Sequence, residues 1–123
     1  MADNVVVNKS FKFAIDTVTI YKYLCEKNEY VLSKQLLRSG TSIGANIREA
    51  IDGQSKKDFL GKMNISLKEA RETEYWIELL IETGYLDRDI HSAYLKDAKE
   101  LYKILNSIVK STKNSLIKEV NIN

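Results

Sequence analysis

Apolar residues recur along most of this chain at steps of three and four positions, the spacing of one side of an α-helix. The 123 residues include no proline and only five glycines, so little interrupts a helix. The pattern predicts one domain over residues 1–123, in which four helices span about 10–27, 29–52, 56–83 and 89–115. Four amphipathic helices with short connections predict an all-α fold, an antiparallel up-down-up-down four-helix bundle.

The two ends of the chain show the weakest periodicity. Residues 1–8 have no helical period and are expected to form an extended arm, with Asn8 or Ser10 capping the first helix. Asn28 is expected to end that helix, Asp87 or Asp89 to cap the last one, and the chain to fray after residue 115. The residues of the first helix expected to face the core are Phe11, Ala14, Ile15, Val18, Tyr21 and Cys25.

The second and third predicted helices have the clearest apolar sides. Gly40 and Gly44 each cost about 1 kcal/mol inside a helix, which favours close approach of a neighbouring helix, with a hinge as the alternative. Gly53 is expected to cap the second helix, and Ser55 with Asp58 to cap the start of the third. The expected core residues are Leu32, Leu36, Ile43, Ile47, Ala50, Phe59, Met63, Ser66, Ala70, Ile77 and Ile81.

The apolar side of the third helix is unusually broad and contains a carboxylate. It extends past Leu80 to Trp76 and Ile65, a width that indicates two packing partners, or one partner and another subunit. Glu69 lies between these residues, and a buried carboxylate must be paired, hydrogen-bonded or protonated. We expect a polar network or interface formed by Asn46, Glu49, Lys62, Glu69, Glu72 and Trp76. A structural role in fixing helix register or a subunit interface is favoured over a ligand or ion site.

Lysines mark the side of the last helix opposite its apolar residues. They extend over about 25 Å, given a rise of about 1.5 Å per residue, and are Lys96, Lys99, Lys103, Lys110 and Lys113. Such a row can follow a phosphate backbone and would bind it with strong salt dependence. Arg38 and Arg48, with Lys34, form a second and looser basic surface on the second helix. A solvated helix surface is the alternative interpretation of both sets.

The residues offer no set for catalysis or for metal binding. The carboxylate-bridged di-metal sites of helical bundles need two Glu-x-x-His motifs, and His91 is the only histidine. The lone Cys25 is expected to be an inert buried thiol, and there is no glycine-rich phosphate loop. The sequence therefore predicts a protein without catalytic residues, metal or cofactor.

Composition limits the partners and the compartment. The net charge is +2, but its distribution is uneven: residues 1–57 carry +3, residues 58–89 carry −4 and residues 90–123 carry +3. One cysteine excludes an intramolecular disulfide and favours a reducing compartment. The N-terminal residues lack the apolar run of a signal peptide, and no segment has the ~18 apolar residues of a membrane span. A cytoplasmic protein with no membrane partner is expected.

Three segments of the sequence identify a family resemblance. They read SIGANIREA over 42–50, SKKDF over 55–59, and ISLKEARE followed by YW over 65–76. They resemble the bacterial four-helix-bundle proteins encoded in intervening sequences of 23S ribosomal RNA genes, which are often called ribosomal proteins because of that location. The resemblance covers residues 10–115. It implies a four-helix protomer in a homopentameric ring without assigned enzymatic activity, related to the accessory proteins of diversity-generating retroelements, basic pentamers that bind nucleic acid and a reverse transcriptase.

Together, the residues and the resemblance predict a non-enzymatic, homo-oligomeric module for binding or scaffolding. Its expected partners are further copies of itself, a pentamer by resemblance, and RNA or an RNA-associated protein. The alternative is a purely structural assembly protein that binds no nucleic acid.

Overall fold

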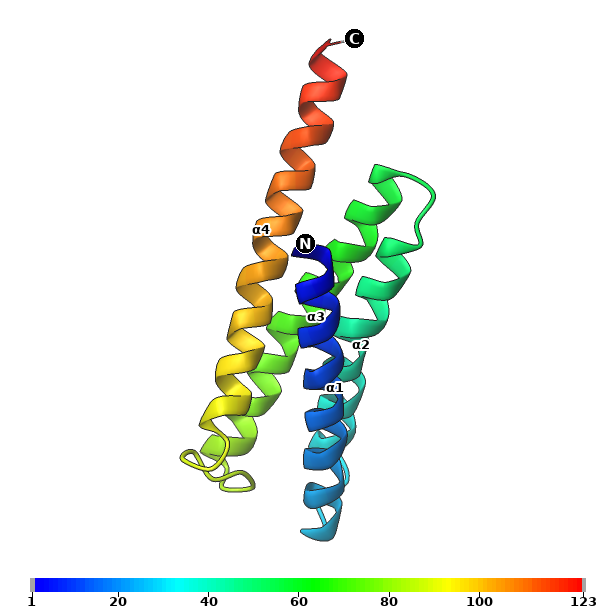
Figure 1. Ribbon diagram of the computed structural model, residues 1–123. Coiled ribbons are helices and arrows are strands. Elements are labelled where there is room, and N and C mark those ends of the chain that lie inside the picture. Colours follow the sequence, from blue (N-terminus) through cyan, green and yellow to red (C-terminus); the bar gives the residue numbers. More distant parts are fainter. Residues whose placement is uncertain (1, 123) are drawn as a thin grey trace.

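Four long helices account for almost all of the described chain. The computed structural model describes residues 2–122, and side chains over 5–121. Its helices are α1 (Ala2–Glu26), α2 (Leu32–Ile51), α3 (Lys56–Glu82) and α4 (Ser92–Ile122). Consecutive helices run in opposite directions, and α4 extends beyond the other three at its C-terminal end (Figure 1). The predicted all-α four-helix bundle is confirmed.

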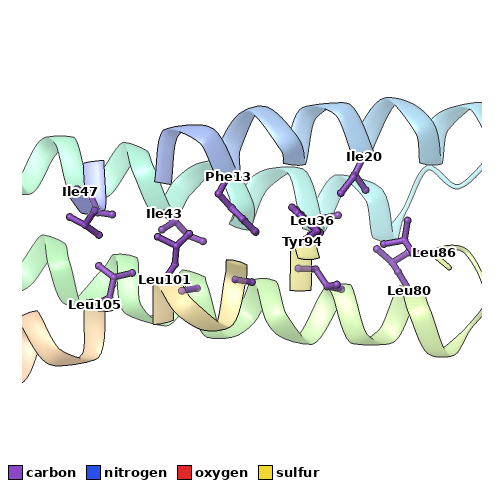
Figure 2. Close-up of a cluster of buried hydrophobic side chains, with 14 of the residues drawn as sticks. Phe13, Ile20, Leu36, Ile43, Ile47, Leu80, Leu86, Tyr94, Leu101 and Leu105 are labelled. Atoms are coloured by element: carbon purple, nitrogen blue, oxygen red, sulfur yellow. The ribbon is translucent and has the colours of Figure 1, made fainter. Parts of the chain in front are cut away.

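The core runs the length of the bundle between the four helices. Each helix packs on its neighbour in the chain, and a smaller contact between α1 and α4 closes the bundle. Figure 2 shows the central side chains, which point toward one another and come from all four helices and from the α3–α4 connection (Leu86); among them are Phe13, Ile20, Leu36, Ile43, Ile47, Leu80, Leu86, Tyr94, Leu101 and Leu105. The predicted core residues of α2 and α3 are buried, except that Leu32 and Phe59 are half-buried.

Helix α1 differs from its prediction in both its start and its orientation. It begins at Ala2, so the extended arm expected over 1–8, and the cap at Asn8 or Ser10, were wrong over the described part of that segment. Its core side consists of Val6, Ser10, Phe13, Thr17, Ile20 and Leu24. The predicted core side was wrong too: Phe11, Ile15 and Val18 are exposed, and Ala14, Tyr21 and Cys25 are half-buried.

The two glycines of α2 explain why small residues of α1 face inward. A Cβ atom on Gly40 would lie 2.7 Å from Thr17 Cγ2, and one on Gly44 would lie 3.2 Å from Ser10 Oγ. Both are closer than ordinary contacts between side chains, so the two helices approach at a distance that only glycine allows. Close approach is therefore the role of both glycines, and α2 continues through them as one helix.

Hydroxyl groups in the core are bonded across the helix seams. Ser66 donates to the carbonyl of Ile43 at 2.8 Å, joining α3 to α2. The hydroxyls of Thr17 and Tyr94 lie 2.7 Å apart, joining α1 to α4, and the Tyr94 ring stacks on Phe13 at 4.6 Å between centroids. Among the described side chains, no buried polar atom lacks a partner. These bonds allow polar groups in the core at little cost.

The predicted ends of the first and third helices and the predicted start of the third are confirmed. Asn28 follows α1 at φ 62° and Gly84 follows α3 at φ 85°, each the left-handed residue that ends a helix. Ser55 caps α3 by accepting the Asp58 N–H at 3.1 Å. Gly53 is not in the left-handed region, so α2 ends without the glycine cap expected there.

Three further helix boundaries differ from those predicted, the starts of α2 and α4 and the end of α4. Glu29, expected to begin α2, instead precedes it and accepts the N–H of Ser33 at 2.7 Å, which caps the helix. Asp87 accepts the N–H of Ile90 at 2.9 Å and so stabilises the turn before α4, not the helix itself. The predicted fraying after residue 115 was wrong, because α4 continues to Ile122.

Candidate functional site

Part of the predicted polar network forms at the edge between α2 and α3. Arg38 of α2 forms ion pairs with Glu69, at 3.2 Å, and with Glu72, both on α3. The indole N–H of Trp76 donates to Glu72 at 2.9 Å. One guanidinium therefore binds two carboxylates one helical turn apart, and an aromatic ring is fixed against the second.

The rest of that network does not join this cluster. Lys62 pairs separately with Glu49, at 3.2 Å, and Asn46 donates to the carbonyl of Ser42 on its own helix. Glu69 lies at the rim of the bundle and not inside its apolar core, since 19% of its side chain remains exposed. Instead of the expected single network, the structure has the Arg38 ion pairs, a separate Lys62–Glu49 ion pair, and one hydrogen bond within α2.

The predicted lysines of α4 form a continuous exposed surface. We call Lys96, Lys99, Lys103, Lys110 and Lys113 the lysine face; all five are exposed. Lys99 lies 3.7 Å from Glu78 of α3, and the other four have no carboxylate within 4.0 Å among the described residues. This face thus keeps most of its charge free of internal ion pairs.

The two arginines predicted with that surface lie elsewhere. Both are on α2, which does not pack against α4. Arg38 is held by its carboxylates, and the Arg48 guanidinium lies over the Phe11 ring of α1, 4.9 Å from its centroid. The structure therefore does not bring Arg38 and Arg48 together with the lysine face, and a nucleic-acid role for them stays a prediction.

An exposed apolar surface on α1 is the main feature that the sequence prediction missed. Phe11, Ile15 and Val18, which we call the α1 stripe, are 52%, 53% and 37% exposed. Beside it is an open hollow of about 230 Å³ whose lining is mostly apolar and comes from Phe11, Ala14, Thr41, Gly44, Ala45 and Arg48. Three large apolar residues at helical spacing on an outer surface are typical of a contact with another protein surface.

A second exposed surface with apolar and aromatic residues lies on α3. Ile65, Glu72, Tyr75 and Leu79 share one side of the helix, and we call them the α3 face. Ile65 is 45% and Tyr75 59% exposed. The Tyr75 ring meets the half-buried Trp76 ring edge-on at 5.1 Å. Arg38, Glu69, Glu72 and Trp76, which we call the Arg38 cluster, border this face through Glu72.

A buried carboxylate on the other side of α3 was also missed. Glu74 faces α4 and is nearly buried; burial raises its pKa, while Arg71, 3.8 Å away, acts in the opposite direction. The Arg71 guanidinium stacks on the Tyr102 ring of α4 at 3.8 Å. The sequence gave little signal for Glu74, because it is one of several glutamates along this helix.

The other sequence candidates for chemistry stand apart from one another. Cys25 is half-buried on α1, and His91 lies in the turn before α4, where its ring contacts the Asp87 carbonyl at 3.0 Å. Over the described residues, no group of three or more His, Cys, Asp or Glu side chains is placed to hold a metal ion. None of the described helices combines the length and apolar character needed to cross a membrane.

Comparison with known proteins assigns the family. The family model described as 23S rRNA-intervening sequence protein matches residues 2–107. A crystal structure of a protein of unknown function from the S23 ribosomal protein family of Bacteroides thetaiotaomicron is similar, with 57% identity and a TM-score of 0.87. The match covers 89% of this chain and 99% of that one. No curated protein matches. The chain therefore belongs to the 23S rRNA-intervening sequence protein family.

Proposed function

We propose that this protein is a non-enzymatic, homo-oligomeric helical scaffold that binds RNA through the lysine face of α4. One observation carries the RNA-binding part: five lysines follow one side of α4 over about 25 Å, and among the described residues only Lys99 has a carboxylate within 4.0 Å. Unpaired lysines in a row match the charges of a phosphate backbone.

The residues of the lysine face favour contacts to phosphates over contacts to bases. The lysine face has no exposed aromatic side chain among its members, so it lacks the platforms on which unpaired bases stack. Contacts to phosphates without base stacking favour binding that depends on charge and shape more than on sequence. In an oligomer the lysine face is repeated once per copy, which increases the local positive potential.

The test is fluorescence anisotropy with a labelled RNA hairpin over a range of salt concentrations. The wild-type chain is expected to bind with an affinity that falls steeply with salt. The double substitution Lys103→Glu and Lys110→Glu is expected to weaken binding and to reduce the salt slope by about 1 for each lysine removed. Lys27→Glu with Lys57→Glu is the matched control, with the same change in net charge at exposed positions outside α4. Equal losses in the two double variants, or no binding by the wild type, would contradict the proposal.

A structural assembly protein that binds no nucleic acid is the second candidate. The observation in its favour is the Arg38 cluster, which fixes the α2–α3 edge beside the exposed α3 face. In this case Glu69→Ala should change the sedimentation of the oligomer, because Arg38 loses one of its two partners. Normal assembly of the wild type without RNA binding would favour this candidate over the first.

A further inference from the structure

We propose that the α1 stripe of one copy packs against the α3 face of a second copy, so that the oligomer is built head to tail. This inference rests on the homo-oligomer proposed above and assigns the surfaces that form it. Both surfaces expose large apolar side chains, Phe11, Ile15 and Val18 on α1 and Ile65 and Tyr75 on α3.

The positions of the two surfaces require a second copy. Helices α1 and α3 do not pack on each other within the bundle. The α1 stripe cannot therefore be covered by the α3 face of its own chain, and each surface is left open on a single protomer. Because the two surfaces differ, the contact is heterologous, and its repetition produces a closed ring or an open filament.

Charge disfavours a contact between two α1 surfaces. On the α1 side, Lys22, Lys34 and Arg48 have no carboxylate within 4.0 Å among the described residues. On the α3 side, Glu69 and Glu72 share Arg38, and Lys68, on the same side of α3, has no carboxylate within 4.0 Å in the described part of the chain. Two α1 surfaces would bring unpaired positive charges together, whereas the head-to-tail contact places those charges beside Glu69 and Glu72.

The hollow beside the α1 stripe gives the contact a specific fit. Its small lining residues Ala14, Thr41, Gly44 and Ala45 leave about 230 Å³ open, with the Arg48 guanidinium at its edge. Tyr75 of a second copy is the exposed aromatic residue of the α3 face and carries a hydroxyl that a guanidinium can bind. Tyrosine, tryptophan and arginine are the residues most enriched at the energetic centres of interfaces.

Sedimentation velocity of single and mixed variants tests this assignment. Ile15→Glu disables the α1 stripe, Ile65→Glu disables the α3 face, and Ile90→Glu, at a 76% exposed position in the turn before α4, is the matched control. Each of the first two variants alone is expected to be monomeric at concentrations where the wild type and the control are assembled. Mixed together, they retain one intact pair of surfaces and are expected to form a one-to-one dimer.

The other outcomes separate this inference from the proposed function. Assembly of both variants like the control would overturn the surface assignment and leave the homo-oligomer standing. Two monomers that remain separate on mixing would also overturn the head-to-tail contact. A wild type that is monomeric would contradict the homo-oligomer itself. Circular dichroism checks that each variant is helical, and Ile15→Ser and Ile65→Ser replace any glutamate variant that does not fold.

Discussion

The α2–α3 seam and the α1 helix use their large apolar side chains in opposite ways. On α2 and α3, residues such as Ile43, Ile47 and Met63 are fully buried, and the small hydroxyl residues only bridge between the helices. On α1, hydroxyl residues line the contact with α2, while Phe11 and Ile15 face outward. Burial on α1 therefore follows the distance between helices, which the glycines set, and not apolar character alone.

Substitution of isoleucine by alanine at a buried and at an exposed position should give the largest difference in stability. Ile43→Ala, in the core of α2, is expected to lower the free energy of unfolding by about 2–5 kcal/mol because it leaves a cavity. Ile15→Ala, on the α1 stripe, should change it by less than about 0.5 kcal/mol in the monomer. Urea unfolding at low protein concentration measures both, and a large loss at Ile15 would show that the stripe is packed within the protomer.

Substitution of two helical glycines tests whether close approach orients α1. Gly40→Ala places a Cβ atom within 2.7 Å of Thr17 and is expected to cost about 1–3 kcal/mol of stability. Gly61→Ala meets no atom within 4 Å inside α3 and should instead stabilise by up to about 1 kcal/mol. Thermal or urea unfolding gives the sign of each change. If both substitutions stabilised the protein, the α1–α2 contact would not be limited by Gly40.

One buried hydroxyl pair joins α1 to α4 beside the stacked rings of Phe13 and Tyr94. Tyr94→Phe keeps the ring stacked on Phe13 and removes only the phenol hydroxyl, which meets Thr17 at 2.7 Å. Thr17 still donates to the carbonyl of Phe13, so the expected loss is about 1 kcal/mol. Thr17→Ser, which keeps the hydroxyl, is the control for this bond in urea unfolding. No loss in Tyr94→Phe would show that the contact is held by packing alone.

Substitution of Glu74 should have the smallest effect on the free energy of unfolding, and that effect should depend on pH. Burial raises its pKa in the folded state, so the folded protein binds this proton more tightly than the unfolded chain does. Its contribution to stability is therefore greatest below the unfolded pKa of about 4.3 and is lost as the pH rises through the folded pKa. Glu74→Gln should remove this loss, which urea unfolding of both proteins at a series of pH values measures. Free energies of unfolding that change in parallel with pH in the two proteins would contradict it.

The sequence predicted the parts of the fold in which apolar character and core position coincide. Ile43, Ile47, Met63 and Ile77 were correctly placed because α2 and α3 bury their most apolar sides. Periodicity failed on α1, because the outward Phe11, Ile15 and Val18 are more apolar than the inward Ser10 and Thr17. The signal was present in Gly40 and Gly44, since a helix that fits against two glycines must offer small residues at matching spacing.

The candidate sites also differ in how much of each the sequence could predict. The lysine face could be predicted because its members lie on one helix, where spacing alone determines which residues share a side. The Arg38 cluster was predicted in its α3 members, Glu69, Glu72 and Trp76, but not in its cation, which comes from α2. Which of several nearby cations makes that contact depends on the rotation of one helix against another, which no single-helix pattern contains.

Cross-linking between the two proposed contact surfaces is a direct test of the head-to-tail contact. In a Cys25→Ser background, Ala45→Cys lies in the hollow beside the α1 stripe, and Lys68→Cys lies at an exposed position on the same side of α3 as the α3 face. A short bismaleimide should link a mixture of these two single-cysteine variants into one covalent dimer that contains both chains, as mass spectrometry would identify. Links only between identical chains, or no link in the assembled protein, would contradict the head-to-tail contact.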